Sequence, residues 1–171
     1  MKRTSAWLAA ALLGAAPAFA APSATDTDFA KKAAEAGMAE ISSGHAAEAN
    51  GASAAVKAFG KKMVDDHAKA ADELKDVAAK SGVELPTTMT AEQKAAGEKL
   101  AGLKGAEFDK AYAEQAVKDH EEAVALFKNE ASAGSDAGLK SFAQQTLPTL
   151  EDHLRMAKAL PSGAGAMSKT P

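Results

Sequence analysis

Residues 53–81 read SAAVKAFGKKMVDDHAKAADELKDVAAKS, and the pattern within them decides the fold. Small and apolar residues recur at alternating steps of four and three, which is the spacing of a buried helix face. That face consists of Val56, Gly60, Met63, His67, Ala70, Leu74, Val77 and Ser81. His67 lies in its middle, where an imidazole needs a partner because burying an unpaired polar group costs about 1 to 3 kcal/mol.

Three further segments predict long helices. Residues 106–132 and 136–160 repeat the apolar face and place His120 and His153 within it. Residues 28–49 predict a helix that carries a stripe of small residues around one acid: Ala33, Gly37, Glu40, Gly44 and Ala47. Four long helices without a strand pattern predict an all-α four-helix bundle.

The linker between the second and third long helices predicts the topology. Residues 82–105 are more numerous than the roughly 2 to 8 residues that join adjacent antiparallel helices. Thr90 and Gln93 form a capping-box pattern, which predicts a short helix inside this linker. A crossover of this length can follow the bundle from end to end. The helices on either side of it are therefore expected to run parallel, in an up-down-down-up arrangement.

The sequence also contains an internal repeat. AVKAF at residues 55–59 and GLKSF at residues 138–142 share a pattern 83 positions apart. The helices predicted at residues 28–49 and 106–132 match best at an offset of 79. The chain is therefore interpreted as two related helical hairpins, with chance similarity between alanine-rich helices as the alternative.

The two ends of the chain carry different signals. Residues 1–20 predict a cleavable export signal, with basic residues, a short apolar run and Ala-Phe-Ala at residues 18–20. We expect a polar leader at 21–27, the helical bundle at 28–160 and a disordered tail at 161–171. The export signal predicts a periplasmic location in a Gram-negative bacterium.

Composition excludes several classes of partner. Cleavage after residue 20 changes the formal net charge from −3 to −5, and the lysines alternate with acids along the chain. No nucleic-acid partner is therefore expected. After the export signal, no continuous apolar run reaches the roughly 20 residues of a membrane span. Cysteine is absent, so stability must come from packing.

The buried histidines define a candidate metal site. Parallel helices place His67 and His120 at one height, because each lies 14 residues after the start of its helix. Glu40 falls about 6 Å from that height at 1.5 Å per residue, whereas His45 misses it by about 13 Å. By the internal repeat His153 falls about one turn away, a gap that a kink at Pro148 would change. The predicted ligands, suited to zinc, copper or iron, are Glu40, His67, His120 and His153.

Besides a metal-binding module, two alternatives stay open: a structural or stress-related bundle and, in third place, an enzyme that uses a metal with oxygen or peroxide. A di-iron centre would need Glu-x-x-His motifs, but Val64, Val117 and Leu150 occupy the positions three before the histidines, which disfavours a ferroxidase. The histidines can instead fix packing alone, by bonding carboxylates or backbone carbonyls. No nucleophile-base pair, phosphate loop or zinc-protease helix occurs, so enzymatic activity is not indicated.

Several ordered motifs carry a resemblance to a known family. They are GMAE at 37–40, VKAF at 56–59, MVDDH at 63–67, GAEFDKAY at 105–112, DH at 119–120 and TLPTLEDHL at 146–154. In these motifs the chain resembles the bacterial family called domain of unknown function 4142. The resemblance implies an exported, ferritin-like bundle without a settled activity. The residues it marks are Glu40, His67, His120 and His153.

Overall fold

The computed structural model describes residues 22–161, and within this range it contains five helices and no strand. The predicted all-α class is therefore confirmed for this part of the chain. The helices are α1 (Ala24–Asn50), α2 (Ala54–Ser81), α3 (Ala91–Ala101), α4 (Gly105–Ala133) and α5 (Ala137–Lys158). The predicted export signal and all but the first residue of the predicted tail lie outside the described residues.

The helix ends follow local capping chemistry. Helix α1 begins at Ala24, four residues before the predicted start, because Ser23 and Asp26 form a capping box that the sequence reading missed. The predicted stop after α2 is correct. Gly82 adopts a φ of 71°, and the Val83 N–H donates to the carbonyl oxygen of Ala78 over 2.9 Å. The predicted capping box at Thr90 starts α3.

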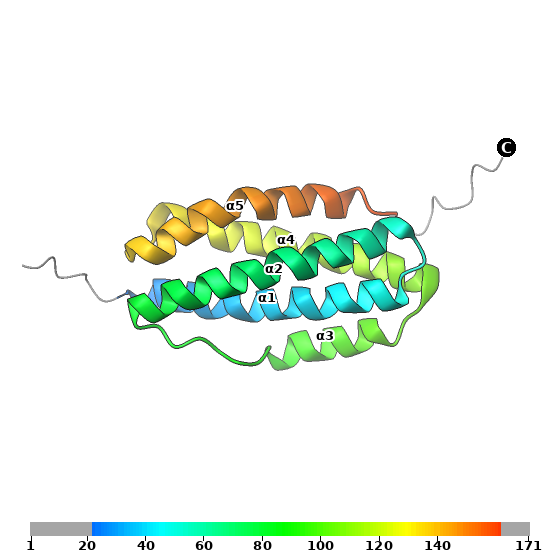
Figure 1. Ribbon diagram of the computed structural model, residues 1–171, viewed down its shortest axis with the longest axis horizontal. Helices are drawn as coiled ribbons and strands as arrows, with labels where there is room; N and C mark the ends of the chain where they lie inside the picture. The colour runs from blue at the N-terminus through cyan, green and yellow to red at the C-terminus, as the bar shows by residue number, and fades with distance from the viewer. Residues whose placement is uncertain (1–21, 162–171) are drawn as a thin grey trace, which may run out of the picture.

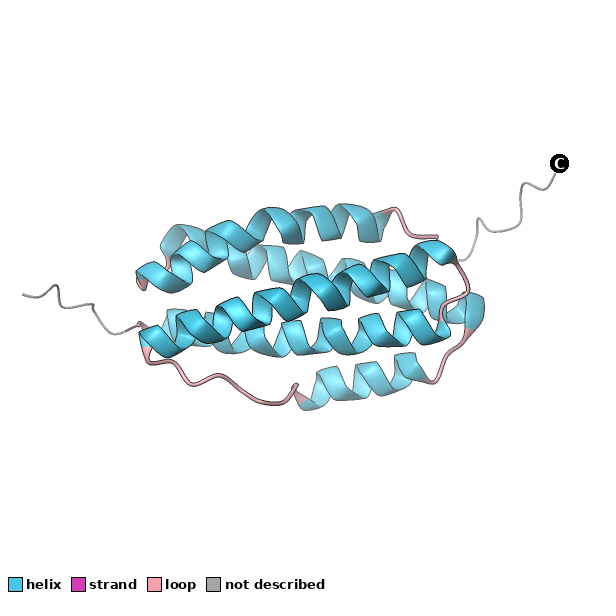
Figure 2. Ribbon diagram, in the orientation of Figure 1, coloured by secondary structure: helices cyan, strands magenta, loops and turns pink. Residues whose placement is uncertain are grey.

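The four long helices lie side by side, and each packs against two neighbours (Figure 1). Gly51 lies three residues before the start of α2, and Gly105 is the first residue of α4. These two glycines form a parallel bridge. Helices α2 and α4 therefore start at the same end and run in the same direction, as the linker length predicted. The segment between α2 and α4 contains the longest loop and then α3, which lies against α1 and α4 (Figure 2).

Two buried aspartates join the hairpins at opposite ends. Asp109 of α4 accepts hydrogen bonds from the N–H groups of residues 52–53 over 2.9 and 2.8 Å, at the start of α2. Asp26 of α1 accepts from the N–H groups of residues 135–136 over 2.8 and 3.2 Å, at the start of α5. Both donors and acceptors are 83 positions apart. One offset of 83 therefore relates both pairs of helices, and the offset of 79 proposed for the first pair is not the one that the structure uses.

Two apolar clusters fill the core and leave a polar layer between them. The first contains, among its largest members, Phe29, Leu74, Phe127, Leu139, Phe142 and Leu150. The second contains Val56, Phe59, Met63, Leu100, Phe108 and Tyr112. On α2, α4 and α5 the histidine falls between the members of the two clusters, so the imidazoles occupy the middle of the bundle.

Pro148 lies inside α5 without ending it, and the helix continues from residue 137 to residue 158. A proline inside a helix can kink or break it, and here the helix does not break. A proline removes one backbone hydrogen bond, but Leu147 and Leu150 on either side pack in the first apolar cluster. This burial holds the helix in place across the missing bond.

In the described part of the chain, no helix combines the length and apolar character needed to cross a bilayer.

The stripe of small residues on α1 has two different roles. At Gly44 an added Cβ would lie 2.7 Å from the Gly60 carbonyl oxygen and 2.9 Å from Cγ2 of Val64, so glycine permits close contact with α2. At Gly37 an added Cβ would meet no described atom within 4 Å. Close approach therefore explains Gly44 and Gly60 but not Gly37.

Gly44→Ala and Gly37→Ala make a matched test on one helix. We expect Gly44→Ala to lower the free energy of unfolding by about 1 to 3 kcal/mol, because the helices must separate. Gly37→Ala should raise it by up to about 1 kcal/mol, because alanine favours the helix and has room. Urea denaturation of both variants measures the difference, and equal shifts would contradict the assigned roles.

Candidate metal centre

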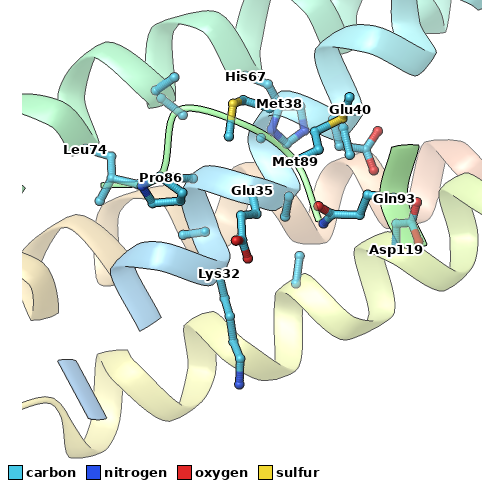
Figure 3. A pocket seen from close by; sticks show the side chains of 18 of the residues that line it. Lys32, Glu35, Met38, Glu40, His67, Leu74, Pro86, Met89, Gln93 and Asp119 are labelled. Atoms are coloured by element: carbon cyan, nitrogen blue, oxygen red, sulfur yellow. The ribbon is translucent and has the colours of Figure 1, made fainter. Parts of the chain in front are cut away.

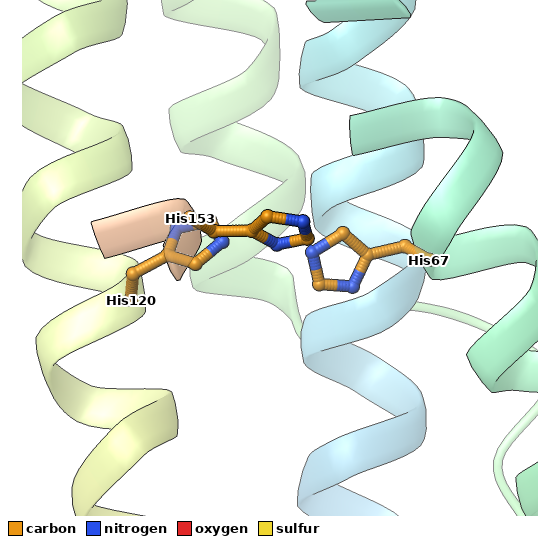
Figure 4. Close-up of side chains that lie close together, drawn as sticks. All are labelled: His67, His120 and His153. Carbon is orange, nitrogen blue, oxygen red and sulfur yellow. The ribbon is translucent and has the colours of Figure 1, made fainter. Parts of the chain in front are cut away.

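His67, His120 and His153 meet in the centre of the bundle, from α2, α4 and α5 (Figure 4). Their ring centroids are separated by 5.7 Å (His67 to His120), 5.5 Å (His67 to His153) and 5.4 Å (His120 to His153). The shared height predicted for the first two is confirmed. His153, which the repeat placed about one turn away, reaches the same level on an unbroken helix.

Two of the rings have a fixed proton. Nδ1 of His120 lies 2.9 Å from the carbonyl oxygen of Ala116, and Nε2 of His153 lies 2.7 Å from Oδ2 of Asp66. A carbonyl or carboxylate oxygen only accepts, so these two nitrogens must carry the protons and donate. In the neutral rings, Nε2 of His120 and Nδ1 of His153 are then left with bare lone pairs.

Three buried ring nitrogens, one on each histidine, have no hydrogen-bond partner among the described residues. They are His67 Nε2, His120 Nε2 and His153 Nδ1. One ligating nitrogen from each ring lies within 4.8 Å of those of the other two. A metal ion with bonds of about 2.0 Å to imidazole would draw such nitrogens closer and satisfy all three. The arrangement therefore has the donor set of a three-histidine metal site.

Burial keeps the three rings neutral. Desolvation, with smaller effects from the neighbouring rings, lowers the pKa of His67 to about 3. Burial also lowers the pKa of His120 to about 4 and that of His153 below its usual value, although the bond to Asp66 opposes the latter shift. At neutral pH protons therefore do not compete for the lone pairs.

Glu40 lies beside the three histidines but outside their group of ligating atoms. Its Oε1 is 3.6 Å from Nδ1 of His120, which is the nitrogen that donates to Ala116 and not the one with the free lone pair. Burial, reinforced by the charge of Asp119, raises the pKa of Glu40 to about 8. The structure thus brings together three of the four predicted ligands and places the fourth on the far side of one ring. His45 is exposed on α1, as its predicted exclusion requires.

Asp66 bonds to one of the three histidines, a contact that sequence reasoning missed. Its neighbour His67 is not its partner, because adjacent helix positions point about 100° apart. Its carboxylate instead bridges to His153 on α5, and it also accepts a bond of 2.7 Å from Lys62. Spacing within one helix cannot reveal a contact between α2 and α5, so no sequence signal for this pair was available.

Comparison with known proteins identifies the family and the fold. The profile of a family described as Domain of unknown function (DUF4142) matches residues 11–160, which confirms the resemblance. No curated protein sequence matches the chain. A crystal structure of a DUF305 fragment from Deinococcus radiodurans is similar with a TM-score of 0.71 and 11% sequence identity, over 81% of this chain and 95% of that one. At this identity the likeness concerns the helical fold alone.

The depressed histidine pKa values predict a loss of stability in acid. Because the folded pKa lies below the unfolded value of about 6.5, the unfolded chain binds more protons, and stability falls as pH drops through that value. Between pH 7 and pH 5 each deeply buried histidine should cost about 2 kcal/mol. Urea denaturation at both pH values should show a smaller decline in His67→Gln than in the unmodified protein, and an unchanged decline would contradict it.

Glu40 should have the opposite pH dependence. Its raised folded pKa means that its contribution to stability is fully present below the unfolded value of about 4.3. That contribution is lost as pH rises through about 8. Glu40→Gln should therefore lessen the decline in stability between pH 6 and pH 9, measured by the same denaturation. Glu130, whose pKa burial raises to about 7, contributes the rest of that decline. A variant whose decline matches that of the unmodified protein would show that the carboxyl is already ionised in the fold.

Proposed function

The chain belongs to the DUF4142 family, and from the geometry of its buried histidines we propose that it is an exported metal-binding protein. The ligands are His67, His120 and His153, with Glu40 beside them. We infer that the export signal at residues 1–20 directs the chain to the periplasm. The arrangement of its four long helices is proposed to be ferritin-like, which agrees with α2 and α4 running parallel.

One observation carries the proposal. Three buried ring nitrogens, one on each histidine, have no described hydrogen-bond partner in a core where burying an unpaired polar group costs about 1 to 3 kcal/mol, and the three rings offer ligand atoms within 4.8 Å of one another. Two of them cannot be relieved by changing tautomer without breaking the bonds to Ala116 and Asp66. A metal ion satisfies all three at once, and a carboxylate bonded to the outer nitrogen of a ligating histidine is the usual support for such a site.

The donor set narrows the metal. Neutral imidazoles suit zinc, copper and iron, and three of them with few carboxylates favour zinc or copper. Among the described acids, Glu40 is the only buried carboxylate next to the rings. A di-iron centre, which needs several carboxylates, is therefore disfavoured. Three protein ligands leave one position of a tetrahedral ion open for water or for a bound molecule.

The alternative is a non-catalytic bundle whose histidines only fix packing. Two of the rings already have one hydrogen bond each. The ring centroid of Phe59 also lies 6.4 Å from that of His120 and 6.5 Å from that of His153, so the histidine layer has apolar contacts as well. Packing alone accounts for the bonded nitrogens of His120 and His153. It gives no partner to the unbonded nitrogen on each of the three rings.

Metal binding is tested by melting of the metal-free protein, purified without a histidine tag. Zinc, copper or iron at 100 times its dissociation constant should stabilise the fold by about 2.7 kcal/mol. For a domain of this size that corresponds to a rise in Tm of roughly 5 to 10 °C. His67→Ala and His120→Ala should abolish the rise, whereas His45→Ala, at an exposed site, should keep it. No shift with any of the three metals, or loss of the shift in His45→Ala alone, would favour packing.

Asp66→Asn tests whether the carboxylate supports a metal ligand. Loss of such an outer partner typically lowers metal affinity 10- to 100-fold. Asp65→Asn is the matched control, because Asp65 pairs with Lys61 just as Asp66 pairs with Lys62 but is exposed. Competition titration of both variants against a chromophoric chelator gives the affinities. Equal affinities in the two variants would remove Asp66 from the site.

A further inference from the structure

A large cavity lies beneath the crossover that joins α2 to α4. Its volume is about 1110 Å³, and α1, the second half of α2, α4 and the segment containing α3 enclose it (Figure 3). Apolar side chains dominate its walls, including Leu74, Leu85, Pro86, Met38 and Met89. The crossover thus covers α1 without closing the space above it.

The cavity persists because the helices around it carry small residues. An added Cβ would meet no described atom within 4 Å at Gly37 of α1 or at Gly97 of α3, and both residues line the cavity. These two glycines are not needed for close helix contact, unlike Gly44 and Gly60. Their effect is to keep the space open.

Polar side chains lie at the inner end of the cavity, where His67, His120 and Glu40 line it. The unpartnered nitrogens of the two rings are themselves buried. His67 is 9% exposed and His120 1% exposed. Figure 3 shows Glu40 and His67 at the same end of the pocket. A molecule in the cavity would therefore meet apolar walls and one polar end.

The volume is far larger than a metal ion needs, since even a water molecule occupies only about 30 Å³ of liquid. Pockets of roughly 300 to 1,000 Å³ hold organic molecules of drug size. The metal centre alone thus leaves almost all of this cavity without an occupant.

The charges on the walls do not select an anion. Three lysines line the cavity, Lys32, Lys75 and Lys118, and two of them are paired, Lys32 with Asp28 at 2.8 Å and Lys118 with Glu122 at 3.9 Å. Besides Glu40, five acidic residues line it and would repel a carboxylate or phosphate: Glu35, Asp72, Glu92, Asp119 and Glu122. An uncharged ligand avoids this repulsion, because it brings no charge into an apolar space.

We propose that the cavity binds a neutral, largely apolar organic molecule with one hydrogen-bonding group, which reaches His67 and Glu40. Binding goes beyond the proposed metal function and does not require the ion.

N-phenylnaphthylamine, a neutral apolar dye, tests the cavity in the metal-free protein. We expect saturable fluorescence enhancement with one dye per chain. Gly37→Phe should weaken binding at least tenfold, because the ring fills the open space. Gly97→Phe on peripheral α3 should do the same and remains informative if Gly37→Phe fails to fold. Ala68→Phe is the control, since Ala68 is exposed on α2 and outside the cavity.

Competition by two ligands of equal chain length tests the charge. Dodecanol should displace the dye at least tenfold more effectively than dodecanoate at pH 8. Equal or stronger displacement by dodecanoate would overturn the neutral ligand class. If Gly37→Phe and Gly97→Phe both fold and still bind the dye as tightly as the unmodified protein, the cavity is not the binding site. Both dye experiments use metal-free protein. They therefore test the cavity even if the melting experiment shows that no metal binds.

Discussion

The reciprocal hydrogen bonds of Asp26 and Asp109 are the interaction on which the rest of the structure depends. Each carboxylate accepts from the N–H groups just before a helix of the other hairpin, which sets the height of α4 against α2 and of α1 against α5. Burial opposes the charge on Asp26, but hydrogen bonds from Ser135 and Ser23 hold its pKa well below its usual range. The register fixed in this way brings His67 and His120 to one level, so the candidate centre follows from contacts at the bundle ends.

The histidine layer divides a core that would otherwise be continuous. Apolar residues lie on both sides of it, with Phe59 packed against two of the rings. Neutral imidazoles in this setting cost less than charged ones, but their inner nitrogens gain nothing from apolar neighbours. The cavity reaches this layer from one side only, through His67 and His120, while His153 is held from behind by Asp66.

Sequence periodicity was sufficient for the parts of the fold that depend on local spacing. It located the helices and put His67, His120 and His153 on buried faces, and the linker length gave the direction of α4. It failed where the answer lies between helices. The bond from His153 to Asp66 and the position of Glu40 behind His120 depend on rotations of neighbouring helices that spacing does not fix. The early start of α1 was a different error, because the Ser23–Asp26 capping box was present in the sequence.

The offset of 83 that relates the two hairpins has an evolutionary consequence. Across this offset His67 corresponds to Leu150, His120 to Gly37, and His153 to Ala70. None of the three imidazoles has an imidazole as its counterpart, although Asp26 and Asp109 do correspond. If both hairpins descend from one ancestral hairpin, the scaffold was inherited by duplication, whereas the histidine cluster belongs to the later divergence of the copies. Gly37, the counterpart of a buried histidine, then marks where one copy gained open space and the other gained a buried imidazole.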